Sequence, residues 1–168
     1  MNGKQPTGVF KIAGSRDAIY VRVIGLGSMT NSVTLKDFVD RMQVEGYRSF
    51  VVDLAVCRAD DSSFMGILLG LSHCQGGGGL VVVNANPHCR KQMESIGLHR
   101  ILKIQAEPAD VPRDLELHEL PEAEASPLQR LKLIMKAHQD LIAIDKKNEE
   151  KFGAFLKDIA KNLGEQGG

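Results

Sequence analysis

The sequence predicts a mixed α/β domain followed by a linker and a helical extension. Three observations support this prediction. Strand-like and helix-like patterns alternate up to residue 104, residues 107–125 are acidic and contain proline, and apolar residues then recur at helical spacing. We therefore expect an α/β domain over residues 1–106, an acidic linker over 107–125 and a helical extension over 126–164.

The first half of the α/β domain is expected to contain three strands and one helix. The strands are short runs rich in β-branched side chains; a polar turn joins the first two, and the third is almost entirely apolar. The helix is predicted by Leu35, Phe38 and Met42, which recur at helical spacing, and Ser32 or Thr34 would cap it. The predicted bounds are 9–13, 18–24 and 49–54 for the strands and 32–45 for the helix.

The second half of the domain continues this alternation. A polar loop over 55–61 leads to a helix that Ser62 or Ser63 opens, and this helix is apolar nearly all round, which predicts that it is buried. Further strands are expected at 80–83 and 101–104, further helices at 62–74 and 87–96, and a glycine connector at 76–79. Repeated β-α-β units place parallel strands side by side, so we expect a mixed sheet whose antiparallel part is the first hairpin.

The two segments after residue 106 differ in charge and in periodicity. The linker has 7 acidic residues and 1 basic residue, whereas residues 1–106 have 8 acidic and 12 basic ones and residues 126–168 have 6 and 8. We therefore expect the linker to lie against one of these basic parts, through contacts that salt weakens. In the extension, polar residues around His138 and Asp145 interrupt an apolar stripe, so one long helix or two helices meeting near 146–150 would fit. The stripe would either pack on its own domain or form a dimer or partner helix.

Composition excludes several classes of protein. The chain carries 21 basic and 21 acidic side chains, so no overall positive charge attracts nucleic acid. Its apolar runs are far shorter than the ~20 residues that span a bilayer, and the first residues lack an apolar signal region, so no membrane association is expected. Three cysteines without C-x-x-C spacing are typical of a reducing compartment, which predicts a cytoplasmic location. The pairs at 73–74 and 88–89 (His-Cys) lack zinc-ligand spacing, so no metal site is expected.

One glycine-rich segment admits a nucleotide-binding alternative. Residues 25–30 read G-L-G-S-M-T, close to the G-x-G-x-x-G of dinucleotide-binding domains, and Asp53 ends the next strand, where a ribose-binding acid would lie. Thr30 replaces the third glycine, however, and the predicted helix begins too late to point its N-terminus at a pyrophosphate. An oxidoreductase using NAD or NADP is therefore the less favoured function, and we expect neither enzymatic activity nor a cofactor.

Two hydroxyl side chains stand where the second helix is expected to begin. An unmodified Ser62 or Ser63 would be a helix N-cap, which satisfies one free backbone N–H. A phosphoserine there would carry about −2 charge at the positive end of the helix dipole, where it is partly stabilised. Asp60 and Asp61 would repel the phosphate, so phosphorylation could act as a switch. From these residues alone, however, an N-cap is the default expectation.

The same segment carries a family resemblance. Residues 61–68, D-S-S-F-M-G-I-L, resemble the D-S-[ST]-G-[LI]-G-x-[LF] signature of the STAS family, the anti-sigma factor antagonists. The apolar strands on either side and the sequence at 95–98 agree with this resemblance, which covers about residues 8–106. It implies a mixed sheet of four or five strands with helices mainly on one face. Phe64 stands where the family usually has its first glycine, and it adds bulk next to Ser62.

The resemblance also implies a function, that of a bacterial partner-switching regulator of transcription. In such proteins a serine kinase that is also an anti-sigma factor phosphorylates the first serine of the signature, and a metal-dependent phosphatase reverses this. By position the phosphoacceptor would be Ser62, with Ser63 as second choice. The expected partner-binding residues are Asp60, Asp61, Ser63, Phe64, Met65 and Gly66, of which the glycine would allow close helix packing. The alternative is an unphosphorylated scaffold or dimerisation module that assembles through 126–164 as a homodimer.

Overall fold

The structure, a computed structural model, describes residues 8–73 and 79–166. The strands are β1 (Val9–Gly14), β2 (Ile19–Gly27), β3 (Phe50–Asp53), β4 (Cys57–Asp60), β5 (Leu80–Val83), β6 (Lys103–Ile104) and β7 (His118–Glu119). The helices are α1 (Met29–Val44), α2 (Ser62–His73), α3 (Pro87–Ser95), α4 (Pro127–Ile144) and α5 (Lys147–Gln166), with a short 3-10 helix η1 (Leu98–Arg100). Of the sequence predictions, the helix end at Cys74, the glycines at 76–78 and the features of the first residues lie outside the described ranges.

A mixed sheet forms the centre of the molecule, as predicted. Its strand order is β6-β5-β3-β2-β1-β7, and β4 pairs with the end of β2. Neighbours among β2, β3, β5 and β6 are parallel, whereas β1 is antiparallel to both β2 and β7. The sheet has seven strands rather than four or five. The additional strands are β4, within the segment predicted to be a loop, and β7, within the predicted linker.

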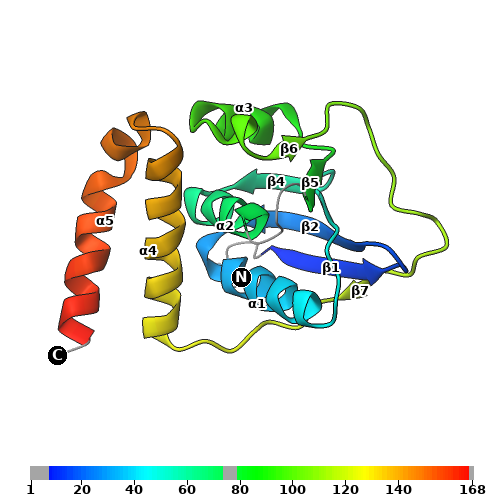
Figure 1. Ribbon diagram of the computed structural model, residues 1–168, viewed down its shortest axis with the longest axis horizontal. Helices are drawn as coiled ribbons and strands as arrows, with labels where there is room; N and C mark the ends of the chain where they lie inside the picture. The colour runs from blue at the N-terminus through cyan, green and yellow to red at the C-terminus, as the bar shows by residue number, and fades with distance from the viewer. Residues whose placement is uncertain (1–7, 74–78, 167–168) are drawn as a thin grey trace, which may run out of the picture.

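Helices α1 and α2 cover one face of the sheet, and α4 and α5 form further layers outside α2 (Figure 1). Phe10, Phe50 and Phe64 are fully buried at the centre of the core. Helix α2 lies between the sheet and α4, which explains why its sequence is apolar nearly all round. No helix within the described ranges is long and apolar enough to cross a membrane.

Helix α1 begins at Met29, three residues before the predicted start. Its N-cap is Ser28, whose backbone N–H donates to Asn31 Oδ1 at 2.9 Å. The prediction that Ser32 or Thr34 caps this helix is therefore wrong. The prediction that the helix begins several residues after Gly27, which counts against the nucleotide-binding alternative, is wrong for the same reason.

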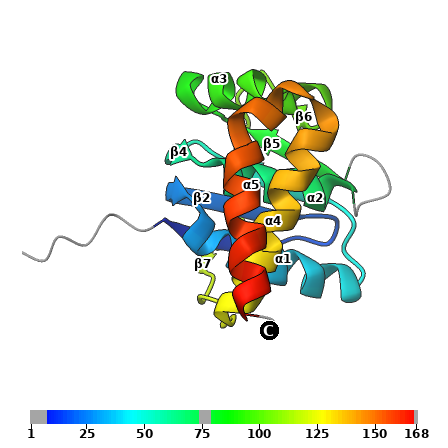
Figure 2. The same ribbon diagram turned by 90° about the vertical axis from the view of Figure 1, so that its left-hand side faces the viewer.

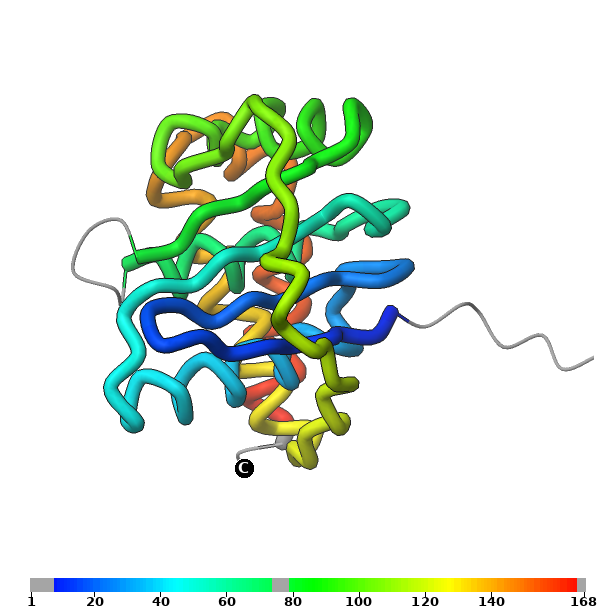
Figure 3. The backbone as a smooth tube through the Cα atoms, turned by 90° about the vertical axis from the view of Figure 1, so that its right-hand side faces the viewer, coloured from blue at the N-terminus to red at the C-terminus, as the bar shows by residue number. Residues whose placement is uncertain are grey.

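The acidic segment after β6 crosses the sheet face opposite the helices (Figure 3). It is fixed there by Asn84, whose Nδ2 donates to the carbonyl of Ala109 at 2.6 Å and whose Oδ1 accepts from the N–H of Ala109 at 2.9 Å. Strand β7 then adds to β1, and the N–H of Ala123 donates to Thr34 Oγ1 at 3.0 Å. Among the described residues, no acidic side chain of 107–125 forms an ion pair. Neutral hydrogen bonds, rather than the expected charge contacts, therefore hold the segment.

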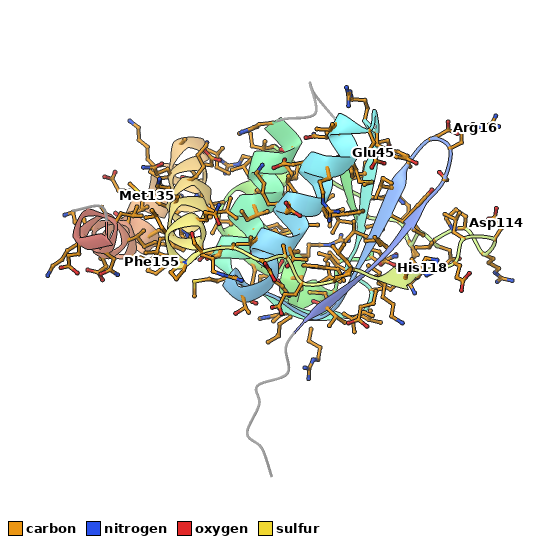
Figure 4. All side chains as sticks on the ribbon, turned by 90° about the horizontal axis from the view of Figure 1, so that it is seen from below. Arg16, Glu45, Asp114, His118, Met135 and Phe155 are labelled. Carbon is orange, nitrogen blue, oxygen red and sulfur yellow. The ribbon has the colours of Figure 1, made fainter. Side chains whose placement is uncertain are left out.

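Helices α4 and α5 form an antiparallel hairpin that stacks on α2 through α4 (Figure 2). The break between them falls at 145–146, so of the two alternatives left open, the structure has two helices. Their apolar stripe packs within the chain, with Ile134, Leu141 and Ile159 buried. Seen from below, Met135 and Phe155 mark the hairpin side of the molecule, and Asp114 and His118 mark the opposite side (Figure 4).

Candidate functional site

The N-terminus of α2 is capped by Asp61 and not by either serine. Asp61 Oδ1 accepts from the N–H of Phe64 at 2.9 Å, and its carbonyl accepts from the N–H of Met65 at 3.0 Å. Its other oxygen, Oδ2, accepts from the N–H of Met29 at 2.9 Å, so one carboxylate satisfies the first turns of both α1 and α2. The prediction that Ser62 or Ser63 is the N-cap is therefore wrong, and the Ser62 hydroxyl has another role.

Ser62 forms a hydrogen bond with the C-terminal hairpin. Its Oγ lies 2.8 Å from Nε2 of His138, 76 residues further along the chain. His138 Nδ1 lies 2.9 Å from the carbonyl of Ile134, which can only accept, so Nδ1 carries a proton. In the neutral ring Nε2 then has no proton, and the Ser62 hydroxyl donates to it.

The His138 ring is enclosed by the hairpin itself. The residue is fully buried, and the rings of Phe152 and Phe155 on α5 contact it edge-on, with centroid distances of 5.2 and 4.7 Å. Burial lowers the pKa of His138, although the Ile134 carbonyl and the Asp61 carboxylate favour the protonated ring. The ring is therefore neutral near pH 7 and accepts the Ser62 hydrogen bond in that form.

One face of α2 is in close contact with α4. Ser62, Gly66 and Gly70 lie four residues apart on this face. A Cβ added to Gly66 would lie 2.6 Å from the carbonyl oxygen of Ala137, so the two helix backbones touch at this point. Beside the contact lies a cavity of about 230 Å³, lined in part by Ile67. The close packing expected at Gly66 thus occurs with the chain's own extension.

Three other residues expected to bind a partner face the interior. Ser63, Phe64 and Met65 are all at least 96 % buried. The Phe64 ring stacks on Phe10 with a centroid distance of 6.3 Å, and it fills the space that a side chain at Gly27 would need. The bulk of Phe64 is therefore accommodated in the core and not beside the Ser62 hydroxyl. Partner binding by these three residues stays a prediction.

Asp60 belongs to a buried polar cluster formed by residues of β4 and α3. Within the described structure neither of its carboxylate oxygens has a hydrogen-bond partner, and desolvation raises the pKa of Asp60 to about 6. The thiols of Cys57 and Cys89 are buried next to it, and the hydrogen bond with the Cys57 thiol, together with burial, raises the pKa of Cys89. No group of three or more His, Cys, Asp or Glu suited to a metal ion occurs among the described residues.

The residues of the nucleotide-binding alternative have structural partners. Asp53 is 2 % exposed and accepts from Arg22 Nε at 3.1 Å and from Asn84 Nδ2 at 3.0 Å. Helix α1 begins at Met29, two residues after Gly27, and its N-terminus is occupied by the Asp61 carboxylate. An incoming pyrophosphate would therefore have to displace an anionic group that is already bound there.

His138 is the site residue that the sequence did not identify. In the sequence it is only a polar interruption of an apolar stripe. His138 lies four residues after Ile134, on the same face of the helix, and it faces aromatic residues of the next helix. This spacing is the signal that could have indicated a buried residue with a role in tertiary packing. Its partner Ser62 could not be found from spacing, because the two residues meet only when the extension folds back onto α2.

The fold of the protein is identified by comparison with solved structures. An anti-sigma factor antagonist from Mycobacterium paratuberculosis superimposes with a TM-score of 0.53 at 18 % sequence identity, over 60 % of this chain and 87 % of its own. A candidate anti-sigma factor antagonist from Thermotoga maritima does so with a TM-score of 0.51 at 22 % identity, over 56 % and 84 %. No family model and no curated protein matches the sequence.

The protein therefore has the STAS fold, the fold of anti-sigma factor antagonists. These neighbours are matched over most of their own length, but they account for only about three-fifths of this chain. The remainder is similar in length to the linker and the helical extension together.

Proposed function

We propose that this protein is a non-enzymatic partner-switching regulator of the anti-sigma factor antagonist type, controlled by phosphorylation of Ser62. One observation carries the proposal: the Ser62 hydroxyl stands on the first turn of α2 but takes no part in capping the helix, because Asp61 does so. Modification of Ser62 would therefore leave the helix end intact. The STAS fold supports the general role.

The chemistry at this position suits a switch. Phosphorylation would replace a neutral hydroxyl with about −2 charge at a helix N-terminus, which stabilises an anion. The same charge would be repelled by the Asp61 carboxylate, which is committed to the two helix ends. The binding surface around Ser62 would thus change while the fold persists. Ser63 is the second choice, although it is only 4 % exposed.

The proposed partners are a serine protein kinase that also acts as an anti-sigma factor and a metal-dependent serine phosphatase, in the bacterial cytoplasm. The proposal is tested by incubating the full chain with the kinases encoded near its gene and ATP, then locating phosphate by mass spectrometry. We expect one phosphate in the wild type and in Ser63→Ala, and none in Ser62→Ala. Equal incorporation into Ser62→Ala would refute the assignment.

A second candidate is an unphosphorylated scaffold that forms a homodimer through the extension. It is favoured by Phe155, a large side chain of α5 that remains 39 % exposed. Sedimentation of the full chain over a range of concentrations tests it. A dimer that Phe155→Lys dissociates supports the scaffold, whereas a monomer at every concentration rules it out.

A further inference from the structure

The surface of α2 around Ser62 is where the proposed kinase must bind, yet α4 already covers it. The contact extends along the helix from Ser62, bonded to His138, through Gly66, whose backbone touches Ala137. It continues to Gly70, where an added Cβ would be in van der Waals contact with Asp140 at 3.5 Å. The hairpin therefore covers one whole face of α2.

We infer that this face is a protein-docking surface which the α4–α5 hairpin occupies in cis, so that hairpin and kinase compete for it. The inference deepens the proposed function and rests on it for the identity of the competitor. Cover of Ser62 by the hairpin does not depend on any kinase, and it can be tested separately.

The geometry at Ser62 requires this competition. The hydroxyl hydrogen is donated to a neutral His138, and the phosphoryl donor must approach the same oxygen. The His138 ring cannot easily rotate away, because Phe152 and Phe155 pack against it and Ile134 holds its other nitrogen. A phosphate group on Ser62 and the seated ring would occupy overlapping space. Hairpin docking and phosphorylation are therefore mutually opposed.

The attachment of the hairpin suits reversible release. Helix α5 packs on α4, and its polar contacts with the STAS domain lie at its first turns: Asn148 Nδ2 donates to the carbonyl of Ile96 at 2.9 Å, and Lys151 Nζ to that of Ser95 at 2.6 Å. The α2–α4 contact also has the cavity of about 230 Å³ beside it, so it is not fully packed. Strand β7 would keep the hairpin tethered after release.

The test measures how accessible position 62 is in the full-length protein. Ser62→Cys provides a thiol whose alkylation by a maleimide is followed by peptide mass spectrometry, which separates it from the native cysteines. Ala137→Glu places a larger, charged side chain against the Gly66 backbone, whereas Ala143→Glu introduces the same side chain at an exposed position of α4. We expect about tenfold faster labelling with Ala137→Glu, because overpacking destabilises the α2–α4 contact enough to raise the population of the released hairpin by this factor or more. We expect no change with Ala143→Glu. Equal labelling rates in all three proteins would overturn the inference.

Phe155→Ala is a milder variant in case Ala137→Glu does not fold, with the exposed Lys157→Ala as its control. It should also speed labelling, because it removes a ring that packs against His138. Kinase assays on the same variants with Ser62 restored separate the two hypotheses. Phosphorylation that is faster in Ala137→Glu supports both, and equal phosphorylation with the wild type overturns the competition alone. Faster labelling without phosphorylation by any kinase overturns the proposed function alone.

Discussion

Ser62 and His138 are joined by a hydrogen bond of 2.8 Å between the STAS domain and the C-terminal hairpin. The bond links the residue proposed to be modified with a buried ring in the segment that covers it. Because the ring is neutral and its Nδ1 is bound to Ile134, the geometry fixes which group donates. The state of Ser62 and the docking of the hairpin are therefore coupled through one contact.

Loss of the Ser62 hydroxyl should raise the pKa of His138, because the neutral ring would lose the donor that stabilises it. We expect Ser62→Ala to show this change in an NMR titration of the ring and to weaken hairpin docking by about 1 kcal/mol. Ser63→Ala is the matched control. An unchanged titration in Ser62→Ala would show that the bond does not persist in solution.

Acid should weaken the hairpin contact through the same ring. Burial lowers the folded-state pKa of His138 below its ordinary value, so the unfolded or undocked chain binds the proton more readily. Stability from this group is present above about pH 6.5 and falls as the pH drops below that value. Once the rates are corrected for the intrinsic pH dependence of amide exchange, the protection of α4 and α5 should fall as the pH drops through this range in the wild type, and less so in His138→Gln. Identical pH profiles for the two proteins would contradict this account.

Asp60 should act on stability in the opposite direction. Its pKa is raised to about 6, so the folded state binds the proton more tightly and loses stability as the pH rises from about 4 to 6. Asp60→Asn removes the buried charge. Its free energy of unfolding relative to the wild type should therefore be about 2–3 kcal/mol more favourable at pH 7 than at pH 4. Urea unfolding of both proteins at each pH measures this difference. The effect of His138 is the same in both proteins and therefore cancels. Asp17→Asn, at an exposed turn, should change little.

Two glycines of α2 should respond differently to alanine. Gly66→Ala forces a Cβ to within 2.6 Å of the Ala137 carbonyl oxygen and should cost about 1–3 kcal/mol. Gly70→Ala meets only an ordinary contact at 3.5 Å and should stabilise the helix by up to about 1 kcal/mol. Denaturant unfolding of the pair tests the packing. If Gly66→Ala were as stable as Gly70→Ala, α4 would not be seated on α2 as described.

Attachment of the acidic segment to the sheet face should depend on Asn84 and not on charge. Asn84 has a φ of 59°, so Asn84→Gly keeps the backbone conformation while removing the bonds to Ala109 and Asp53. Proteolysis within 107–117 should become several-fold faster, since about 1–2 kcal/mol of hydrogen bonding is lost. In the wild type the rate should change little between about 0.05 and 0.5 M salt, because few exposed charges contribute. A strong salt dependence would show that charge contacts hold the segment, as its composition predicts.

The sequence predicted the elements that local patterns specify, and it failed where partners lie far along the chain. The five main strands and the central helices follow from apolar periodicity and turn residues. Strand β4 is not predicted because its sequence, C-R-A-D, is short and carries two charged residues, and it is defined by pairing with the end of β2. The sequence assigns the cap of α2 to the wrong residue because three adjacent side chains could each serve. In the structure Asp61 accepts from the N–H of Phe64 and also from that of Met29, which lies far from it in the sequence.

The candidate site divides in the same way. Ser62 was found from a local signature, whereas His138 lies on a different helix and the bond depends on tertiary packing. Phe64 was expected to add bulk beside Ser62, and its actual direction is set by the space above Gly27 and the ring of Phe10. Neither neighbour is close to it in sequence. Such complementarity between remote residues is not visible in a single sequence.

The 76-residue separation between Ser62 and His138 also has a consequence for timing. A ribosome adds about 5–20 residues per second, so roughly 4–15 s pass between the synthesis of these two positions. The strands β5, β6 and β7 are completed within that interval, and until α4 is made the growing chain has no hairpin to cover Ser62. By the competition inferred above, a phosphate added to Ser62 before α4 is made would keep the hairpin from seating on α2.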